Sequence, residues 1–334
     1  MKVTNKEQAI NKQNPLTLLL GYLQRENYRF TTISPASHEK VNNRPQNGMA
    51  NNLTDIFGWN RSFKRESIDA KLFHIMQSAN IAIKVEKGWR SQLRVSSINE
   101  LLFLHSAYPT LGNEAVFFGP DTYRFANVIT QYFATHQQPI HRAVDIGTGS
   151  GVGAVLLALA LSRPVSKIES EIVALDINNH ALDLARVNMR LNISAANMHH
   201  ITFVQSNLLH NVTGNFDLII ANPPYLLDEA ERAYRHGGGQ LGADLSLHIV
   251  DAAIKRLNPN GTLLLYTGVA IVNGHDAFLA KVAVKLNFAG FTYEYSEIDP
   301  DIFGEELNNK AYSMADRIAA VVLTARKEAE CVHA

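Results

Sequence analysis

The chain has 334 residues, of which 46% are hydrophobic and 19% are charged, so a large buried core is expected and extensive disorder is not. Lysine plus arginine and aspartate plus glutamate both number 31, a balance that argues against holding nucleic acid through bulk charge alone. The single cysteine, Cys331, excludes a disulfide framework and a thiolate zinc site. No stretch reaches the roughly 20 apolar residues that cross a bilayer, so we expect a cytoplasmic protein without membrane contact.

Residues 1–115 are predicted to form a small N-terminal α+β domain that recognises the substrate. Its expected elements are a helix over 14–30, with Asn14 as cap and Pro15 in the first turn, a loop over 31–54, a helix over 67–86 and strands over 91–95 and 101–105. The most basic stretch contains Lys84, Lys87, Arg90 and Arg94. We interpret it as a solvated face, with an RNA contact as the alternative.

Residues 116–334 show the regular alternation of an α/β domain. After a helix over 122–135, strands are predicted at 143–146, 172–176, 201–205, 216–222 and 262–267, with helices at 152–161, 180–191, 246–257 and 275–286. Such alternation indicates βαβ units and a mostly parallel sheet that is covered on both faces. The last two strands, 291–298 and 317–324, have no helix of the usual length between them and are expected to form an antiparallel hairpin at the sheet edge.

A glycine loop follows the first strand of this sheet. Glycine occupies alternate positions in this loop, at Gly147, Gly149, Gly151 and Gly153. A helix is predicted to begin directly after the loop. This placement lets a ligand approach the backbone at the carboxyl ends of the strands. The helix N-terminus favours either a pyrophosphate or the carboxylate of an amino-acid-like cofactor.

Two acids indicate which cofactor the loop holds. Asp176 ends the second strand, where its carboxylate can accept hydrogen bonds from both hydroxyls of a ribose. Asp145 precedes the glycines inside the first strand, where it could meet an ammonium group. S-adenosylmethionine has such an ammonium and NAD lacks it. The pattern therefore predicts a nucleoside cofactor and favours S-adenosylmethionine.

The fourth strand ends in the run 222–225, Asn-Pro-Pro-Tyr. Two prolines hold the backbone rigid beside the cofactor. The amide oxygen of Asn222 and the carbonyl of Pro223 are two acceptors that suit an –NH2 group, and Tyr225 supplies a ring to stack on a flat π-system. We therefore predict transfer of a methyl group to a planar nitrogen, with these three residues in the catalytic site and no metal.

These segments resemble the class I methyltransferases. Residues 144–151 match their first motif and 174–178 their second, which implies that Thr148 and Ile177 also contact the cofactor and that Ser206 and Asn207 flank the adenine. Asn207 stands where the family usually has an acid. The resemblance implies a Rossmann-like sheet that ends in an antiparallel hairpin.

The Asn-Pro-Pro-Tyr run resembles HemK-type protein glutamine methyltransferases and N6-adenine methyltransferases. The segment 119–122, Gly-Pro-Asp-Thr, also resembles the HemK group, in which an arginine commonly replaces Gly119. Residues up to about 115 match no motif of that group. The acceptor is therefore a protein glutamine, an RNA base or a small molecule.

Other functions explain less of the sequence. An NAD(P)-dependent oxidoreductase would use the glycine loop and Asp176 but leave residues 222–225 unexplained. A non-catalytic cofactor-binding scaffold would not need Asn222. The loop over 226–242 is either a lid above the acceptor or an ordinary surface loop, and nothing in the sequence indicates an oligomeric state.

Overall fold

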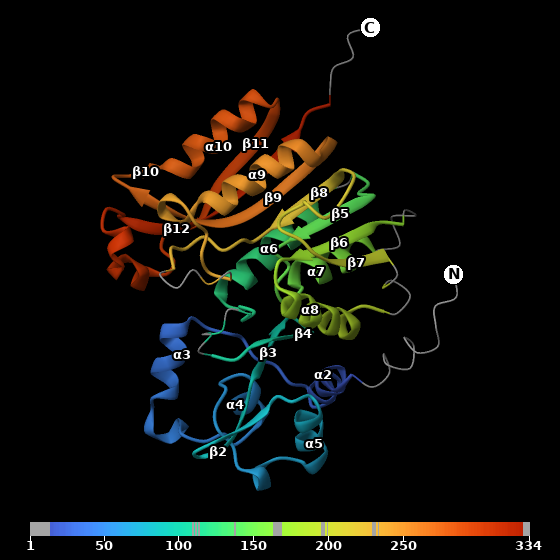
Figure 1. The fold of residues 1–334 in the computed structure, drawn as a ribbon, viewed down its shortest axis with the longest axis vertical. Helices are drawn as coiled ribbons and strands as arrows, with labels where there is room; N and C mark the ends of the chain where they lie inside the picture. The colour runs from blue at the N-terminus through green and yellow to red at the C-terminus, as the bar shows by residue number, and fades with distance from the viewer. Residues whose placement is uncertain are drawn as a thin grey trace.

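The structure is a computed structural model that describes residues 14–108, 110, 112, 114–136, 138–162, 169–194, 198, 200–228, 232 and 234–329. It has two parts, a small N-terminal part and a large α/β part built on one sheet (Figure 1). The predicted combination of a Rossmann-like sheet and a smaller α+β unit is confirmed. Within the described residues, no helix has the length and apolar run that a membrane span requires. Cys331 lies outside the described residues.

The N-terminal part consists of short helices followed by two hairpins. The elements are α2 (Pro15–Arg25), α3 (Pro35–Asn42), α4 (Leu53–Phe57), α5 (Ala70–Ser78), β1 (Ala82–Val85), β2 (Gly88–Ser91), β3 (Leu93–Ile98) and β4 (Leu101–Ser106). Strands β1 and β2 form one antiparallel pair and β3 and β4 another, so the expected small sheet is two separate hairpins.

Three sequence predictions for this part need adjustment. The first helix has its expected cap, with the Leu16 amide donating to Asn14 Oδ1 over 2.9 Å, but it ends at Arg25. The expected loop over 31–54 contains α3 and the start of α4, each begun by a side-chain cap. The helix expected to reach residue 86 ends at Ser78, because Asn80 adopts a left-handed φ of 55° and the chain turns into β1.

The large part is an eight-stranded sheet with strand order β11-β12-β9-β8-β5-β6-β7, with β10 paired to β9. Strands β5 to β9 are parallel, and β12 runs antiparallel to both β9 and β11. The strands are β5 (Arg142–Ile146), β6 (Glu171–Asp176), β7 (Ile201–Gln205), β8 (Phe216–Ala221), β9 (Leu257–Val272), β10 (His275–Asp276), β11 (Phe291–Asp299) and β12 (Arg317–Lys327). The predicted terminal antiparallel pair is present, and β12 inserts between β9 and the edge strand β11 rather than lying outside both.

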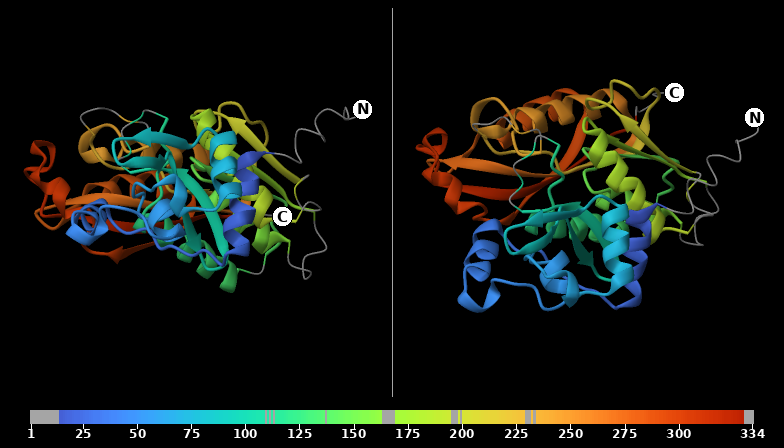
Figure 2. Two further views of the ribbon diagram at one scale, coloured as in Figure 1. Left: turned by 90° about the horizontal axis from the view of Figure 1, so that it is seen from below. Right: turned by 60° about the horizontal axis from the view of Figure 1, so that its bottom comes forward.

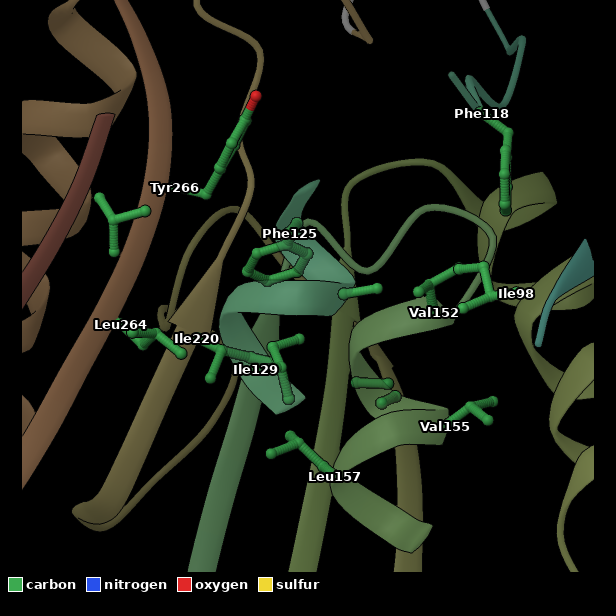
Figure 3. Close-up of a cluster of buried hydrophobic side chains, with 14 of the residues drawn as sticks. Ile98, Phe118, Phe125, Ile129, Val152, Val155, Leu157, Ile220, Leu264 and Tyr266 are labelled. Carbon is green, nitrogen blue, oxygen red and sulfur yellow. The ribbon is translucent and has the colours of Figure 1, made fainter. Parts of the chain in front are cut away.

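Helices cover both faces of this sheet. They are α6 (Pro120–Thr135), α7 (Val152–Leu161), α8 (Asn179–Asn192), α9 (Asp244–Arg256) and α10 (Ala277–Phe288). Along β8, Leu218 and Ile220 join the core under α6 and α7, whereas Ile219 joins the core under α9 and α10. Figure 3 shows the first of these cores, with Phe125 of α6 above the strands. Successive side chains of a strand point to opposite faces of the sheet, and both faces are buried here. The predicted strands are therefore continuous apolar runs.

The N-terminal part packs against α8. Ala181, Leu184 and Val187 of that helix share one apolar core with α2, α5 and the β3–β4 hairpin. The free edge of β4 is completed by α8, because Asn188 donates to and accepts from the Leu104 backbone over 3.0 and 2.8 Å. The right view of Figure 2 shows the N-terminal part beside the sheet domain. The N-terminal part is thus held against the helix that follows β6.

Candidate functional site

A cavity of about 390 Å³ opens at the carboxyl ends of β5, β6 and β8. Its floor is the glycine loop, and its far wall comes from the N-terminal part and the segment before α6. Every predicted site residue except Gly151 lines it, namely Asp145, Gly147, Thr148, Gly149, Asp176, Ile177, Ser206, Asn207, Asn222, Pro223 and Tyr225. Residues separated by up to 80 positions in the sequence therefore meet because parallel strands end at the same sheet edge.

The glycine loop rests on Asp145. This carboxylate is 2% exposed, and its Oδ2 accepts the Thr148 hydroxyl over 2.6 Å and the Ala154 amide over 2.9 Å. Its Oδ1 accepts no hydrogen bond from the described residues. Burial raises the pKa of Asp145 to about 6. A Cβ added at Gly147 would meet no atom within 4 Å, so the space above the loop is open.

Asp176 ties the loop to the next strand. Its Oδ2 accepts the Gly149 amide and its Oδ1 accepts the Asn178 amide, both over 2.9 Å. The Ile177 backbone also lies within hydrogen-bonding reach of this carboxylate, which has about four acceptor positions, so acceptor capacity remains for a ligand. Burial raises the pKa of Asp176 as well, which favours a ligand that donates hydrogen bonds to it.

The loop after β7 forms the next wall of the cavity. Ser206 is buried, donates its amide to the Asp176 carbonyl over 3.0 Å and accepts the Asn211 amide on its hydroxyl over 3.1 Å. Its side chain therefore holds the loop, whereas the exposed Asn207 side chain keeps its amide group for a ligand. Ile177 is 51% exposed at the cavity wall, where a bound planar base would cover it.

Gly151 has a packing role in the structure. It does not line the cavity, it has a φ of 83°, and a Cβ placed there would lie 2.9 Å from the Cβ of Ala185 in α8. Gly151 thus allows a close approach between the start of α7 and α8, and its predicted contact with the cofactor stays a prediction.

Asn222 and Pro223 lie at the end of β8 and line the cavity as predicted. The Asn222 side chain makes no hydrogen bond to the described residues, so its amide oxygen is available to a donor. The ring of Tyr225 is fixed in place by its contacts. It is 7% exposed, its hydroxyl donates to Asp121 Oδ2 over 2.6 Å, and a Cβ at Gly268 would lie 2.3 Å from its ring.

Asp121, which sequence reasoning did not single out, organises this corner of the site. It is 3% exposed, and its Oδ1 accepts the Tyr266 hydroxyl over 2.6 Å and Arg124 over 3.0 Å. Burial and the nearby Asp121 raise the pKa of Tyr225 well above its usual range, which keeps its hydroxyl a donor at neutral pH. The available signal was the 119–122 segment, whose acid proves to be buried beneath the Asn-Pro-Pro-Tyr run.

The ring of Phe117 leaves no room for a side chain at Gly119. A Cβ at this position would lie 2.5 Å from the ring of Phe117, which lines the cavity. An arginine here, as in the family that the segment resembles, would have to displace that ring. This chain thus has the ring of Phe117 against a glycine at the position where the family that it resembles commonly has an arginine.

The described part of the 226–242 loop roofs the cavity. Arg232 and the Tyr234 hydroxyl both donate to the Thr110 carbonyl, and Arg235 pairs with Glu306. Arg232, Tyr234 and Arg235 line the cavity. The roof is thereby fastened both to the segment that joins the two parts and to the residues before β12.

The basic stretch of the N-terminal part is not one solvated face. Lys84 and Lys87 are exposed, but Arg94 is only 5% exposed because β3 points it inward. For the described residues, no group of three or more His, Cys, Asp or Glu side chains could hold a metal ion.

Residues 124–272 match the family model of the methyltransferase small domain. The chain is 35% identical over 144 residues to a release factor glutamine methyltransferase of Haemophilus influenzae, covering 39% of this chain and 47% of that protein. It is 34% identical over 176 residues to the release factor glutamine methyltransferase of Deinococcus radiodurans, covering 49% and 55%. A ribosomal protein uL3 glutamine methyltransferase of Neisseria gonorrhoeae is 31% identical over 143 residues, covering 40% and 45%. The chain thus spans about half the length of these relatives.

Among solved structures, a ribosomal protein L11 methylase from Lactobacillus delbrueckii is 20% identical, covers 64% of this chain and 81% of its own, and has a TM-score of 0.40. That score is too low to transfer any feature of its site.

Proposed function

We propose that this chain, which carries a methyltransferase small domain over residues 124–272, transfers a methyl group from S-adenosylmethionine to a glutamine side-chain amide of a protein. The observation that carries the proposal is the position of Asn222 and Pro223, two fixed acceptors at the mouth of the same cavity as Asp145 and Asp176. The relatives whose names specify glutamine support the choice of acceptor.

The cavity fits this cofactor by its chemistry. Asp145 Oδ1 suits an ammonium, the remaining acceptor capacity of Asp176 suits a ribose hydroxyl, and Ile177 offers an apolar surface for adenine. When bound, the cofactor supplies an electrophilic methyl group on its sulfonium. The raised pKa values of both acids favour a ligand that brings positive charge or hydrogen-bond donors.

The amide nitrogen of glutamine is a poor nucleophile, and the residues at the end of β8 would orient it for methyl transfer. The lone pair of an amide nitrogen is delocalised into the carbonyl. Asn222 Oδ1 and the Pro223 carbonyl would accept the two N–H groups, fix the plane of the amide and turn its nitrogen toward the methyl group. Tyr225, locked by Asp121, would bound the other side of the acceptor. Residues 1–115 would then select the protein that presents the glutamine in the cytoplasm.

The test is transfer of labelled methyl from S-adenosylmethionine into lysate of cells that lack this protein, counted separately in protein, RNA and small molecules. We expect label in protein, on glutamine after digestion, and about a hundredfold slower labelling with Asn222→Ala. Label only in RNA would contradict the glutamine assignment and favour a base. Label only in small molecules would assign the enzyme to metabolism, and cofactor binding without transfer would contradict catalysis.

A further inference from the structure

Arg94 is a buried cation without a carboxylate partner. Its Nε donates to the Gly58 carbonyl over 2.8 Å and its Nη2 donates to Thr32 Oγ1 over 3.3 Å. Both acceptors are uncharged, and they use two of the five N–H groups of a guanidinium. Burial lowers the pKa of Arg94 to about 10; Tyr28 and Tyr123 oppose this effect in part, and no carboxylate of the described residues does. The side chain is therefore still charged at neutral pH.

The polar groups around Arg94 are neutral and already committed to one another. His105 Nδ1 lies 3.1 Å from the Ser106 carbonyl, so that nitrogen carries the hydrogen and Nε2 accepts the Ser96 hydroxyl over 2.7 Å. Ser96 Oγ must then accept the Thr32 hydroxyl, which leaves Thr32 Oγ1 to accept from Arg94. This directional chain of hydrogen bonds uses the hydroxyls fully and supplies no negative charge.

Arg94 lines a second cavity that adjoins the cofactor cavity. The small cavity holds about 20 Å³, which is room for about one water molecule or one oxygen atom of a ligand. Its wall includes four residues that also line the large cavity, namely Pro35, Tyr108, Thr110 and Phe117. Arg94 thus comes from the N-terminal part to the edge of the space where the methyl acceptor has to lie.

We propose that Arg94 binds a carboxylate of the methyl acceptor, next to the nitrogen that is methylated. A buried charge is costly unless an opposite charge meets it, and the guanidinium has free N–H groups suited to the two oxygens of a carboxylate. A space of about one water molecule admits one oxygen of a carboxylate but not the larger phosphate of a nucleic-acid backbone. The inference rests on the proposed function only in assuming that the acceptor occupies the large cavity.

The first experiment uses acetate and its neutral isostere acetamide as probes at constant ionic strength. Binding is followed by thermal unfolding and by tryptophan fluorescence, since Trp59 lies 5.6 Å from the ring of His38, a residue of the small cavity. We expect acetate to raise the unfolding temperature and acetamide to leave it unchanged. Arg94→Met should lose the response to acetate, whereas Thr32→Val, which keeps the cation, should bind acetate within about threefold of wild type.

Three results would overturn the inference: an equal response to acetamide, an unchanged response in Arg94→Met, or tighter binding of methyl phosphate than of acetate. If Arg94→Met does not fold, Arg94→Lys replaces it. Lysine keeps the charge without the planar fork, so acetate should bind roughly three- to tenfold more weakly.

The second experiment identifies the source of the carboxylate with glutamine peptides. One carries a neighbouring glutamate, one a free C-terminus, and one is amidated and neutral. We expect KM to be about 10- to 100-fold higher for the neutral peptide, and Arg94→Met to abolish the difference. Equal KM values for all three would contradict the inference. Calorimetric titration with S-adenosylhomocysteine separates the two proposals. If wild type does not bind this molecule, the proposed function is contradicted, but the acetate result still supports the role of Arg94.

Discussion

Asp121→Leu is expected to destabilise the protein and to reverse the effect of a second substitution, Tyr225→Phe. The carboxylate accepts the Tyr225 and Tyr266 hydroxyls, each over 2.6 Å, in a site where all three side chains are buried. A buried donor that loses its acceptor costs about 1–3 kcal/mol. Two such donors make the expected loss about 4 kcal/mol in the free energy of unfolding.

The sign of the Tyr225→Phe effect tests the reasoning. In wild type this substitution removes a hydrogen bond to a charged group, which costs about 1.5–3 kcal/mol. In the Asp121→Leu background it removes a stranded hydroxyl, so it should be neutral or stabilising. The assay is urea unfolding followed by far-ultraviolet circular dichroism for the two single variants and the double variant. An equal cost of Tyr225→Phe in both backgrounds would refute the role of Asp121 as the anchor of Tyr225.

Three further predictions concern the site and its supports. Asn222→Ala should lower turnover by about a hundredfold while S-adenosylhomocysteine affinity stays within about threefold, and Asn207→Ala should instead weaken that affinity, both measured by calorimetry and methyl transfer. Because burial raises the pKa of Asp145 to about 6 from an unfolded value near 3.9, its contribution to stability is present below about pH 4 and is lost as the pH rises through 6. Urea unfolding of Asp145→Asn should lack that dependence, and a parallel pH profile in both proteins would contradict it. Asn188→Ala removes three buried hydrogen bonds to β4 and the glycine loop, so it should lower the free energy of unfolding by about 2–4 kcal/mol, measured from urea midpoints. A loss below about 0.5 kcal/mol would show that Asn188 does not stabilise the packing of the N-terminal part against α8.

Local sequence patterns predicted most of the sheet domain because its elements follow short-range rules. A strand buried on both faces is apolar at every position, a glycine loop before a helix has a required backbone, and an acid at the end of the next strand follows from parallel topology. Asp145, Asp176 and Asn222 could therefore be placed at one sheet edge without coordinates.

The N-terminal part was predicted less well, because its short elements depend on caps and turns. The periodic apolar residues over 67–86 read as one helix, and only the left-handed turn at Asn80 separates α5 from β1. The helices inside 31–54 are too short to show a period and are begun by single capping residues, Ser34 and Asn52.

The sequence by itself determined the sheet domain, the cofactor loop and the acceptor motif, since each is encoded within a few consecutive residues. Tertiary structure alone decided the roles of Asp121 and Arg94. Asp121 is an ordinary acid of a first helical turn until β8 and β9 bring two tyrosine hydroxyls to it. Arg94 looks like one more cation of a basic stretch until the packing of β3 turns it inward beside Thr32. Burial and partnership depend on contacts between distant segments, and composition or periodicity does not encode them locally.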